Sequence, residues 1–353
     1  MDIYDNREFD GHELLIFGQD GASGLKAIIA IHSTALGPAA GGCRMWPYAS
    51  TADAVTDVLR LSRGMSYKNA MAGLPFGGGK AVIIGDARTA KTPELFAAFG
   101  RMVDSLRGRY ITAEDVGTTS ADMGQVARVT RYVAGLGRQA GQAGGDPAPK
   151  TALGVFLGLR AAVKFRLGRS DLSGLTVAVQ GVGGVGYHLC GLLATAGARL
   201  KVADVEARAV ERACDEFGAT PVAPVRMLEE EADVLAPCAL GAVLNARTIA
   251  KLRVPVIAGA ANNQLARAQD GEGLRAAGIL YAPDYVINAG GIISVAREYY
   301  GGTEAQVIED IQAIPARLTE IFERARRESR PTNAVADVLA RERLRNEAER
   351  LVA

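Results

Sequence analysis

The sequence is poor in the residues that anchor small secreted folds or metal centres. Only four cysteines occur among 353 residues, they are scattered without a CxxC pair, and only three histidines are available to join them at a metal site. We therefore expect reduced thiols and no bound metal. The first residues lack the basic and apolar stretches of a signal peptide, and no apolar run has membrane-spanning length. These absences predict a cytoplasmic protein.

An excess of charge of one sign is also lacking. The chain has 40 Lys and Arg against 39 Asp and Glu, a net charge of +1, so no overall field attracts nucleic acid or an anionic membrane. We expect neither as a partner. With 48% hydrophobic and 22% charged residues, the composition is that of an ordinary α/β protein, and 353 residues favour two domains.

Glycine and proline are concentrated in residues 135–149, at a density that neither a helix nor a strand tolerates. We interpret this stretch as a hinge between two domains. Before it, short β-branched segments bounded by glycine predict strands over residues 25–31 and 81–84. Apolar spacing predicts a helix over residues 50–63, and Thr92 followed by proline predicts the start of another helix.

After the hinge, short strands alternate with helical stretches, which predicts right-handed crossovers and a mostly parallel sheet. The four predicted strands cover residues 176–180, 200–203, 233–235 and 254–258. Residues 305–353 are charged and of helical character, with an interruption near Pro331. We expect the last helix to fold back on the first domain.

A glycine-rich motif, GVGGVG, directly follows the predicted strand at residues 176–180 and opens a helix. In this context the glycines permit a tight turn, close approach of a pyrophosphate and close helix packing, while the helix N-terminus offers free N–H groups. A glycine-rich turn without a ligand is the simpler alternative. We predict a dinucleotide site formed by Gly181, Val182, Gly183, Gly184, Val185 and Gly186.

Asp204 ends the next predicted strand, about 20 residues after the glycines, where an acidic side chain bonds the ribose hydroxyls and repels a 2′-phosphate. This position favours NAD over NADP, although Arg208 nearby partly offsets the repulsion. A helix cap or a surface charge is the alternative role for Asp204.

Lys68 and Lys80 lie in an apolar, glycine-rich segment, MSYKNAMAGLPFGGGK. Most lysines are solvated surface charges. Here, however, three consecutive glycines are expected to let the backbone and Lys80 approach a small ligand. An ammonium that is shielded from water and close to a second one releases its proton more readily, which suits proton transfer, and Lys68 would pair with a substrate carboxylate.

Glu114 and Asp115 lie where a strand is predicted to end, before a helix, in YITAEDVGTT. Strand ends of such sheets are where ligands bind. We expect Asp115 to hold the substrate ammonium and exchange protons with it. Capping of the following helix is the alternative role.

Taken together, these motifs resemble the glutamate/leucine/phenylalanine/valine dehydrogenases. The resemblance covers nearly the whole chain and rests on the lysine segment, TAEDVGT, GVGGVG, APCALGA, GAANNQL and YAPDYVINAGG, which occur in the family's order. It implies a substrate-binding and oligomerisation domain at residues 1–135, completed by residues 331–353. It also implies a Rossmann-type NAD-binding domain at residues 136–330, with a cleft between the two, and a homo-oligomer ranging from dimer to octamer.

The resemblance also assigns roles. It makes Lys80 the general acid and base that activates water, gives Asp115 a part in proton transfer at the amino group, and has Lys68 and Asn262 bind the substrate carboxylate. Besides the glycine loop and Asp204, it places the following residues at the cofactor: Arg44, Thr151, Val205, Cys238, Ala239, Asn262 and Asn288. Lys150 departs from the uncharged residue expected there, and the sequence offers no reason for it.

The predicted substrate is a neutral, apolar L-amino acid. The glutamate-specific branch has a lysine shortly before the glycines of the first-domain loop, whereas this chain has GPAAGG at residues 37–42, and an unpaired substrate carboxylate would be costly there. By resemblance the side-chain pocket is formed by Ala40, Gly41, Ala113, Ile292 and Val295. Leucine, valine and isoleucine are favoured because several segments are most similar to the leucine and valine branch. The small Ala40 keeps phenylalanine as the alternative.

Two other functions fit the sequence less well. A non-enzymatic NAD-binding regulator has no use for two lysines and Asp115 beside a glycine triplet. A 2-hydroxy-acid dehydrogenase normally needs a catalytic histidine, and His32 and His188 lie outside the motifs expected to line the cleft.

Overall fold

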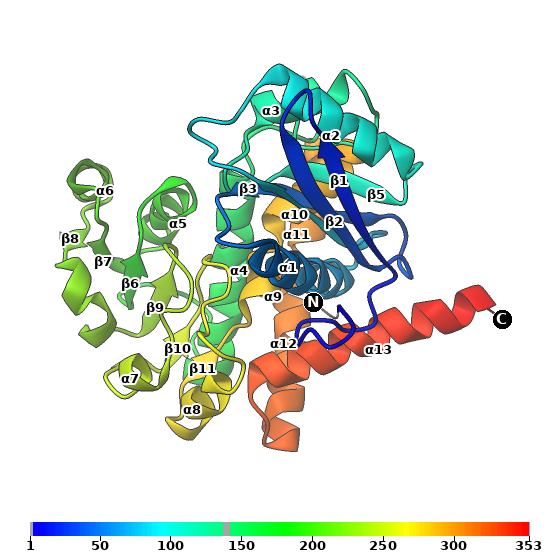
Figure 1. Ribbon diagram of the computed structural model, residues 1–353. Helices are drawn as coiled ribbons and strands as arrows, with labels where there is room; N and C mark the ends of the chain where they lie inside the picture. The colour runs from blue at the N-terminus through cyan, green and yellow to red at the C-terminus, as the bar shows by residue number, and fades with distance from the viewer. Residues whose placement is uncertain (1–2, 137–141, 353) are drawn as a thin grey trace. The chain divides into compact units, whose positions relative to one another are not determined.

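The computed structural model describes residues 3–136 and 142–352, and the chain divides into two compact units (Figure 1). The first unit comprises Met1–Gly145, Val295–Glu304 and Ala340–Ala353, and the second comprises Asp146–Ser294 and Ala305–Leu339. Each unit contains its own β-sheet flanked by helices. The predicted α/β fold with two domains is confirmed.

The first unit extends further along the chain than the predicted domain at residues 1–135. Beyond residues 137–141 of the predicted hinge, which lie outside the described residues, the chain stays with this unit because the Ala143 N–H donates to the Gly302 carbonyl at 2.9 Å. Residues 295–304 also return to it, and the Phe76 ring stacks on Tyr300 with ring centroids 5.3 Å apart. The predicted boundaries omit this returning segment.

The last helix, α13 (Thr332–Val352), is divided between the units. Its beginning belongs to the second unit, where the Thr332 hydroxyl donates to the Tyr281 carbonyl at 2.6 Å. Its remainder, from Ala340 onward, belongs to the first unit, where Arg341 Nε donates to the Tyr67 hydroxyl at 2.7 Å. The end of the chain therefore folds back on the first unit, nine residues later than position 331.

The first unit is built on a five-stranded sheet of order β1-β2-β4-β3-β5. The two pairs β1/β2 and β2/β4 are antiparallel, whereas β4/β3 and β3/β5 are parallel. The strands are β1 (Leu14–Asp20), β2 (Leu25–Ser33), β3 (Ala39–Trp46), β4 (Gly77–Ile84) and β5 (Tyr110–Glu114). Strands β2, β4 and β5 were expected from the sequence, and β1 and β3 were not.

Helices cover both faces of this sheet (Figure 1). On one face, Ile28 of β2 packs with Val55 and Leu59 of α1 (Thr51–Ala72). On the other, Ile29 of β2 packs with residues of α2 (Pro93–Ser105) and α3 (Ser120–Ala127). Because successive strand residues point to opposite faces, the continuous apolar run of β2 fits a strand that is buried on both sides.

Helix α1 is longer than the helix predicted at residues 50–63. It begins after Ser50, whose side chain accepts the Asp53 N–H, and ends at Gly73, which has a left-handed φ of 65°. Lys68 is therefore on the last turns of a helix and not in a glycine-rich loop. The predicted start of α2 is confirmed, since the Thr92 side chain accepts the Leu95 N–H.

The glycine triplet at the start of β4 allows protein segments to pack closely. A Cβ on Gly78 would lie 2.1 Å from the Ser66 N and Oγ atoms of α1, and a Cβ on Gly79 would lie 2.7 Å from the Tyr110 ring. We expected these glycines to admit a ligand. The structure instead fills the space beside them with α1 and β5, so that only glycine fits at these positions.

The second unit has a six-stranded sheet of order β11-β10-β9-β6-β7-β8, and every pairing in it is parallel. Its strands are β6 (Thr176–Gln180), β7 (Arg199–Ala203), β8 (Thr220–Pro221), β9 (Val234–Pro237), β10 (Val256–Ile257) and β11 (Leu280–Tyr281). Strands β6, β7, β9 and β10 fall on the four predicted segments. The mostly parallel sheet predicted for this part of the chain is confirmed.

Short crossovers connect these strands, as expected for a nucleotide-binding fold. The helices are α4 (Ala148–Leu167), α5 (Gly184–Thr195), α6 (Ala207–Phe217), η1 (Pro224–Glu229), α7 (Ala246–Ile249), α8 (Asp270–Ala276) and α9 (Asp284–Ile287). They are followed by α10 (Gly290–Tyr299), α11 (Glu304–Ile311) and α12 (Ile314–Glu328). Among the described helices, none is both long and apolar enough to cross a membrane.

Candidate active site

An ion pair joins the buried Lys80 and the half-buried Asp115 in the first unit. Lys80 lies in β4 and Asp115 directly follows β5, and the Lys80 Nζ atom is 3.0 Å from the Asp115 Oδ2 atom. Strand β3 lies between β4 and β5. Its Gly42 has no side chain, and a Cβ there would lie 2.8 Å from the Asp115 Cβ. Glycine at position 42 of β3 thus leaves room for Asp115.

The Asp115 carboxyl is held in its ionised form. Burial raises the pKa of this group, but the charges of Lys80 and Arg44 outweigh burial and leave the pKa below its ordinary value. Helix capping is not its role, because the cap of α3 is Thr119, whose side chain accepts the Asp122 N–H. The predicted alternative role of Asp115 is therefore wrong.

Arg44 of β3 lies on the other side of Asp115. Its Nε donates to Asp115 Oδ2 at 3.0 Å, and its Nη1 donates to Asp57 Oδ2 at 3.0 Å. The family resemblance placed Arg44 at the cofactor and gave no indication of these two contacts. In the first unit Arg44 is part of the network that holds Asp115.

Lys68 lies on the turn of α1 that packs against the glycine triplet. The side chain of the next residue, Asn69, donates to the Gly77 carbonyl of β4 at 2.6 Å, and Asn69 is fully buried. Helix α1 and strand β4 are therefore fastened together beside Lys68, and β4 carries Lys80 three residues after Gly77. The two lysines belong to directly bonded elements, which accords with a shared site.

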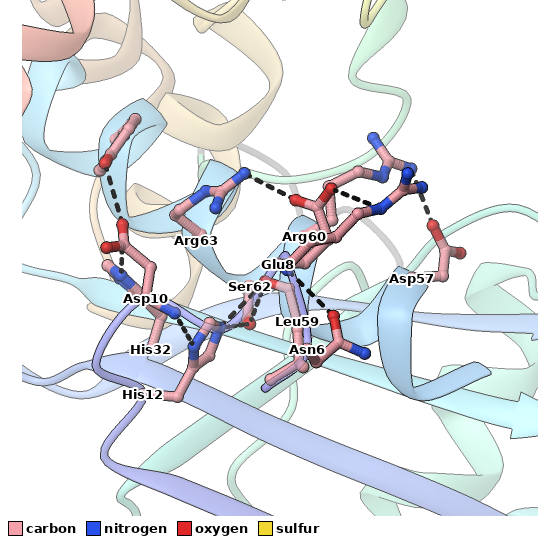
Figure 2. Close-up of polar contacts among 12 residues, drawn as sticks. Asn6, Glu8, Asp10, His12, His32, Asp57, Leu59, Arg60, Ser62 and Arg63 are labelled. Carbon is pink, nitrogen blue, oxygen red and sulfur yellow. Dashed lines mark hydrogen bonds and ion pairs between the residues drawn. The ribbon is translucent and has the colours of Figure 1, made fainter. Parts of the chain in front are cut away.

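The histidines of the first unit are used to hold α1 (Figure 2). The His32 Nδ1 atom is 2.7 Å from the Ser66 Oγ atom, and the His12 Nε2 atom is 3.1 Å from the Ser62 Oγ atom. Burial, followed by the neighbouring His12, lowers the pKa of His32 to about 4, and burial lowers the pKa of His12. Both rings are neutral near pH 7 and packed between β-sheet and helix, which disfavours a 2-hydroxy-acid dehydrogenase with either as its catalytic histidine.

The residues expected to form the side-chain pocket are divided between the units. Ala40 and Gly41 are on β3 and Ala113 is on β5, and Ala40 and Ala113 are buried. Val295 belongs to the first unit and Ile292 to the second, because α10 starts in one and ends in the other.

The glycine loop of the second unit leads from β6 into α5. Gly181 has a left-handed φ of 94°, and a Cβ on Gly186 would lie 1.9 Å from the Gly181 carbonyl oxygen. Gly183 is the N-cap of α5, makes no side-chain capping bond, and has open space where its Cβ would be. Two glycines thus permit the tight turn, and the third leaves the helix N-terminus open to a ligand.

Asp204 at the end of β7 is bonded to this loop. One carboxylate oxygen accepts the Val182 N–H at 2.8 Å, and the other accepts the Glu206 N–H at 3.0 Å. Each oxygen retains a lone pair for a further donor. The next residue, Val205, is 95% exposed.

Except for Arg44, which is in the first unit, the other residues expected at the cofactor also lie in the second unit, and two of them are in contact. Asn288 Nδ2 donates to Asn262 Oδ1 at 2.8 Å. Thr151 lies in the first turns of α4, and Cys238 and Ala239 follow β9. Burial raises the pKa of the Cys238 thiol to about 12, which disfavours this cysteine as a nucleophile.

Comparison with known proteins identifies the family. The description "Glu/Leu/Phe/Val dehydrogenase, dimerisation domain" matches residues 15–132, and "Glutamate/Leucine/Phenylalanine/Valine dehydrogenase" matches residues 199–349. The chain belongs to this family. The inferred resemblance is confirmed, and with it the assignment of the chain as an amino-acid dehydrogenase that acts on CH–NH₂ donors.

Relatives in this family match the chain over nearly its full length. A leucine dehydrogenase of Geobacillus stearothermophilus is 50% identical over 98% of this chain and 94% of its own. A phenylalanine dehydrogenase of Bacillus thermotolerans is 45% identical over 96% of this chain and 90% of its own. Among solved structures, L-tryptophan dehydrogenase from Nostoc punctiforme superposes with a TM-score of 0.86 at 46% identity, covering 96% of this chain and 97% of its own.

Membership in this dehydrogenase family implies a nicotinamide cofactor, and the second unit fits one. The open N-terminus of α5 suits a pyrophosphate, and Asp204 retains acceptor sites for ribose hydroxyls. Within residues 3–136 and 142–352, no group of three or more His, Cys, Asp or Glu side chains is arranged to hold a metal ion.

The sequence analysis did not identify Asp57, which binds Arg44, or Tyr48, which binds Asp57. Asp57 is on α1, Tyr48 precedes that helix, and Tyr48 donates its hydroxyl proton to Asp57 Oδ2 at 2.7 Å. Only one local signal pointed to them, the spacing of Asp57 and Arg60 on one helix face.

Proposed function

We propose that this protein is an NAD-dependent dehydrogenase that oxidatively deaminates leucine, valine and isoleucine. The products are the 2-oxo acid, ammonium and NADH, and the reaction is reversible. The observation that carries the proposal is the Lys80–Asp115 pair, 3.0 Å apart and largely buried, in a chain 50% identical to leucine dehydrogenases. A lysine and a carboxylate in contact can divide the proton transfers of deamination between them.

A bound nicotinamide would supply the acceptor for the hydride of the substrate α-carbon. Lys68 and Asn262 hold the substrate carboxylate, which fixes the α-carbon in position. Lys80, in its neutral form, takes a proton from the water that attacks the imino carbon. Asp115 exchanges protons with the amino group. This group leaves as ammonia and gains a proton to become ammonium. The sum is amino acid, NAD⁺ and water giving 2-oxo acid, ammonium, NADH and a proton.

NAD is proposed over NADP because of Asp204. Its carboxylate stands at the end of β7, bonded to the glycine loop at Val182, where it would repel a 2′-phosphate. Val182, Gly184 and Val185 of the loop, with Thr151, Val205, Cys238, Ala239, Asn262 and Asn288, complete the proposed cofactor set. Lys150 is buried in α4.

A branched aliphatic side chain is proposed for the substrate because every pocket residue expected from the family is apolar. Several leucine dehydrogenases are 50% identical to the chain, compared with 45% for phenylalanine dehydrogenases. Phenylalanine is the second candidate, because Ala40 is small and a larger residue would fill the space that a ring needs. We further propose a homo-oligomer, which the dimerisation-domain description over residues 15–132 supports. We also propose a cytoplasmic location.

The direct test is a panel of L-amino acids with NAD, read by NADH absorbance, and the same panel with NADP. We expect leucine, valine and isoleucine to be oxidised best, glutamate not at all, and NAD to be used in preference. If phenylalanine exceeds all three, the second candidate replaces the first. If the whole panel is silent, the enzyme is not an amino-acid dehydrogenase and a non-enzymatic NAD-binding regulator is the better interpretation.

Ala40→Leu tests which substrate the pocket accommodates. Overpacking costs about 1–3 kcal/mol, and because about 1.4 kcal/mol corresponds to tenfold, the ratio of kcat/KM for phenylalanine over valine should fall roughly 10-fold or more. Ala40 is buried, so some variant protein is expected to be inactive, but the ratio cancels the active fraction. An equal loss with both substrates would remove Ala40 from the pocket.

A further inference from the structure

A row of alternating charges extends from Lys80 to the surface of α1. Asp115 accepts Lys80 and Arg44 at the same oxygen, Oδ2, each at 3.0 Å. Arg44 continues to Asp57 at 3.0 Å, and Asp57 continues to Arg60 at 2.8 Å. The Lys80 side chain is 7% exposed, those of Asp115, Arg44 and Asp57 are 18–22% exposed, and that of Arg60 is 37% exposed. Five charges of alternating sign thus connect the buried pair with solvent.

Asp57 is the best-held member of this row. Its Oδ2 atom accepts both Arg44 and the Tyr48 hydroxyl, the latter at 2.7 Å, and its Oδ1 atom accepts Arg60, a contact that Figure 2 shows at the edge of the cluster. Burial raises the pKa of Asp57, but these hydrogen bonds and the two arginines outweigh it and lower the pKa. Asp57 is therefore a fixed anion.

Arg44 is bonded at two points and connects the fixed Asp57 to Asp115. Its Nε contacts Asp115 and its Nη1 contacts Asp57, so the planar guanidinium cannot turn without breaking one bond. Without Asp57, Arg44 would be held by Asp115 alone. The position of the Asp115 carboxylate beside Lys80 thus depends on a residue of α1 whose side chain does not touch Lys80 or Asp115.

We propose that Asp57 is a positioning residue for the deamination reaction, acting through Arg44 on Asp115. This inference rests on the proposed function of Lys80 and Asp115. The charges also balance in the state that the reaction needs: when Lys80 is neutral, Asp115, Arg44, Asp57 and Arg60 sum to zero. Replacing Asp57 by a neutral residue leaves a surplus positive charge in this row.

Asp57→Asn is the principal test, with Asp53→Asn as its matched control. Asp53 lies one turn earlier on the same helix, is exposed, and bonds with Ser50 at the helix cap. For Asp57→Asn we expect kcat to fall about 10-fold, with KM for the amino acid changed less. The rise of kcat with pH should move to lower pH by about half a unit or more. Asp53→Asn should match the wild type in both.

Two further variants separate positioning from folding. Tyr48→Phe removes the hydroxyl that holds Asp57 but leaves every charge, so kcat should fall a few-fold with the pH profile in place. Asp57→Glu restores the charge and should return the pH profile toward that of the wild type. Thermal unfolding identifies variants that fail to fold, in which case Tyr48→Phe carries the test.

The outcomes are distinct. A wild-type enzyme that is silent on every amino acid overturns the proposed function, and the positioning role with it. An active wild type whose Asp57→Asn and Tyr48→Phe variants match Asp53→Asn in kcat and pH profile overturns the positioning role alone. If Asp57→Asn loses activity only in proportion to its unfolded fraction, Asp57 is structural and the inference is wrong.

Discussion

Lys80→Ala should lower kcat for amino-acid oxidation by about 10²–10⁴-fold, the usual contribution of a general acid–base group. Lys80 is the group assigned to take a proton from the attacking water, and alanine has no titratable atom. Binding of NADH should be unchanged, because the proposed cofactor loop lies in the second unit and Lys80 lies in the first. Stopped-flow rates and a fluorescence titration with NADH measure the two separately.

The removal of Lys80 also leaves Asp115 paired with Arg44 alone, so a loss of stability must be distinguished from a loss of chemistry. Lys91→Ala is the matched control. Lys91 is a half-buried lysine of the same unit that pairs with Asp122 at 2.5 Å, outside the proposed site. The Lys91→Ala variant should lose as much stability as Lys80→Ala or less, and its kcat should equal that of the wild type. Near-normal kcat in folded Lys80→Ala would exclude Lys80 as the acid–base group.

Most elements of the fold could be predicted from the sequence, and the exceptions have a physical cause. Strand β2 was predicted from its apolar run, and the start of α2 was predicted from a hydroxyl residue followed by proline. Both signals are local in the sequence. Strand β3 was missed because its first residues, AAGG, have neither bulk nor alternation. It is a strand only because β4 and β5 pair with it on both sides.

In the candidate site, too, local features could be predicted from the sequence and long-range contacts could not. Lys80 and Asp115 could be selected because each lies in an unusual local setting, a lysine after three glycines and a carboxylate after a strand. Arg44, Asp57 and Asp115 could not be connected, because their contacts join positions 13 and 71 residues apart. Contacts of this range depend on sheet order, and the sequence contained no signal that β3 lies between β4 and β5.

The glycine triplet before Lys80 was correctly selected from the sequence, but the reason given for it was incomplete. A close approach was expected at these glycines, and the structure contains one, but the partner is Ser66 of α1. Their contribution to the site is therefore indirect. They set the distance between the helix that carries Lys68 and the strand that carries Lys80.

Gly78→Ala should accordingly damage both stability and catalysis. Its Cβ would lie 2.1 Å from the backbone nitrogen of Ser66 and 2.5 Å from its Cα, atoms that cannot move aside without shifting α1. Overpacking of a core typically costs about 1–3 kcal/mol, and we expect the upper end of this range in the free energy of unfolding. Because a misplacement of about 1 Å can cost 10²-fold in rate, kcat/KM should fall about 100-fold in the folded fraction.

Gly64→Ala makes the same chemical change on α1 and provides the contrast. A Cβ on Gly64 would meet nothing within 4 Å, and this glycine lies within the helix. Since glycine in a helix interior is about 0.5–1 kcal/mol less favourable than alanine, this variant should be more stable than the wild type and equally active. The double variant should recover stability but not kcat/KM, because a more stable helix does not restore its distance from β4. Recovery of activity in the double variant would mean that Gly78 supports stability alone, and that the spacing of Lys68 and Lys80 does not depend on it.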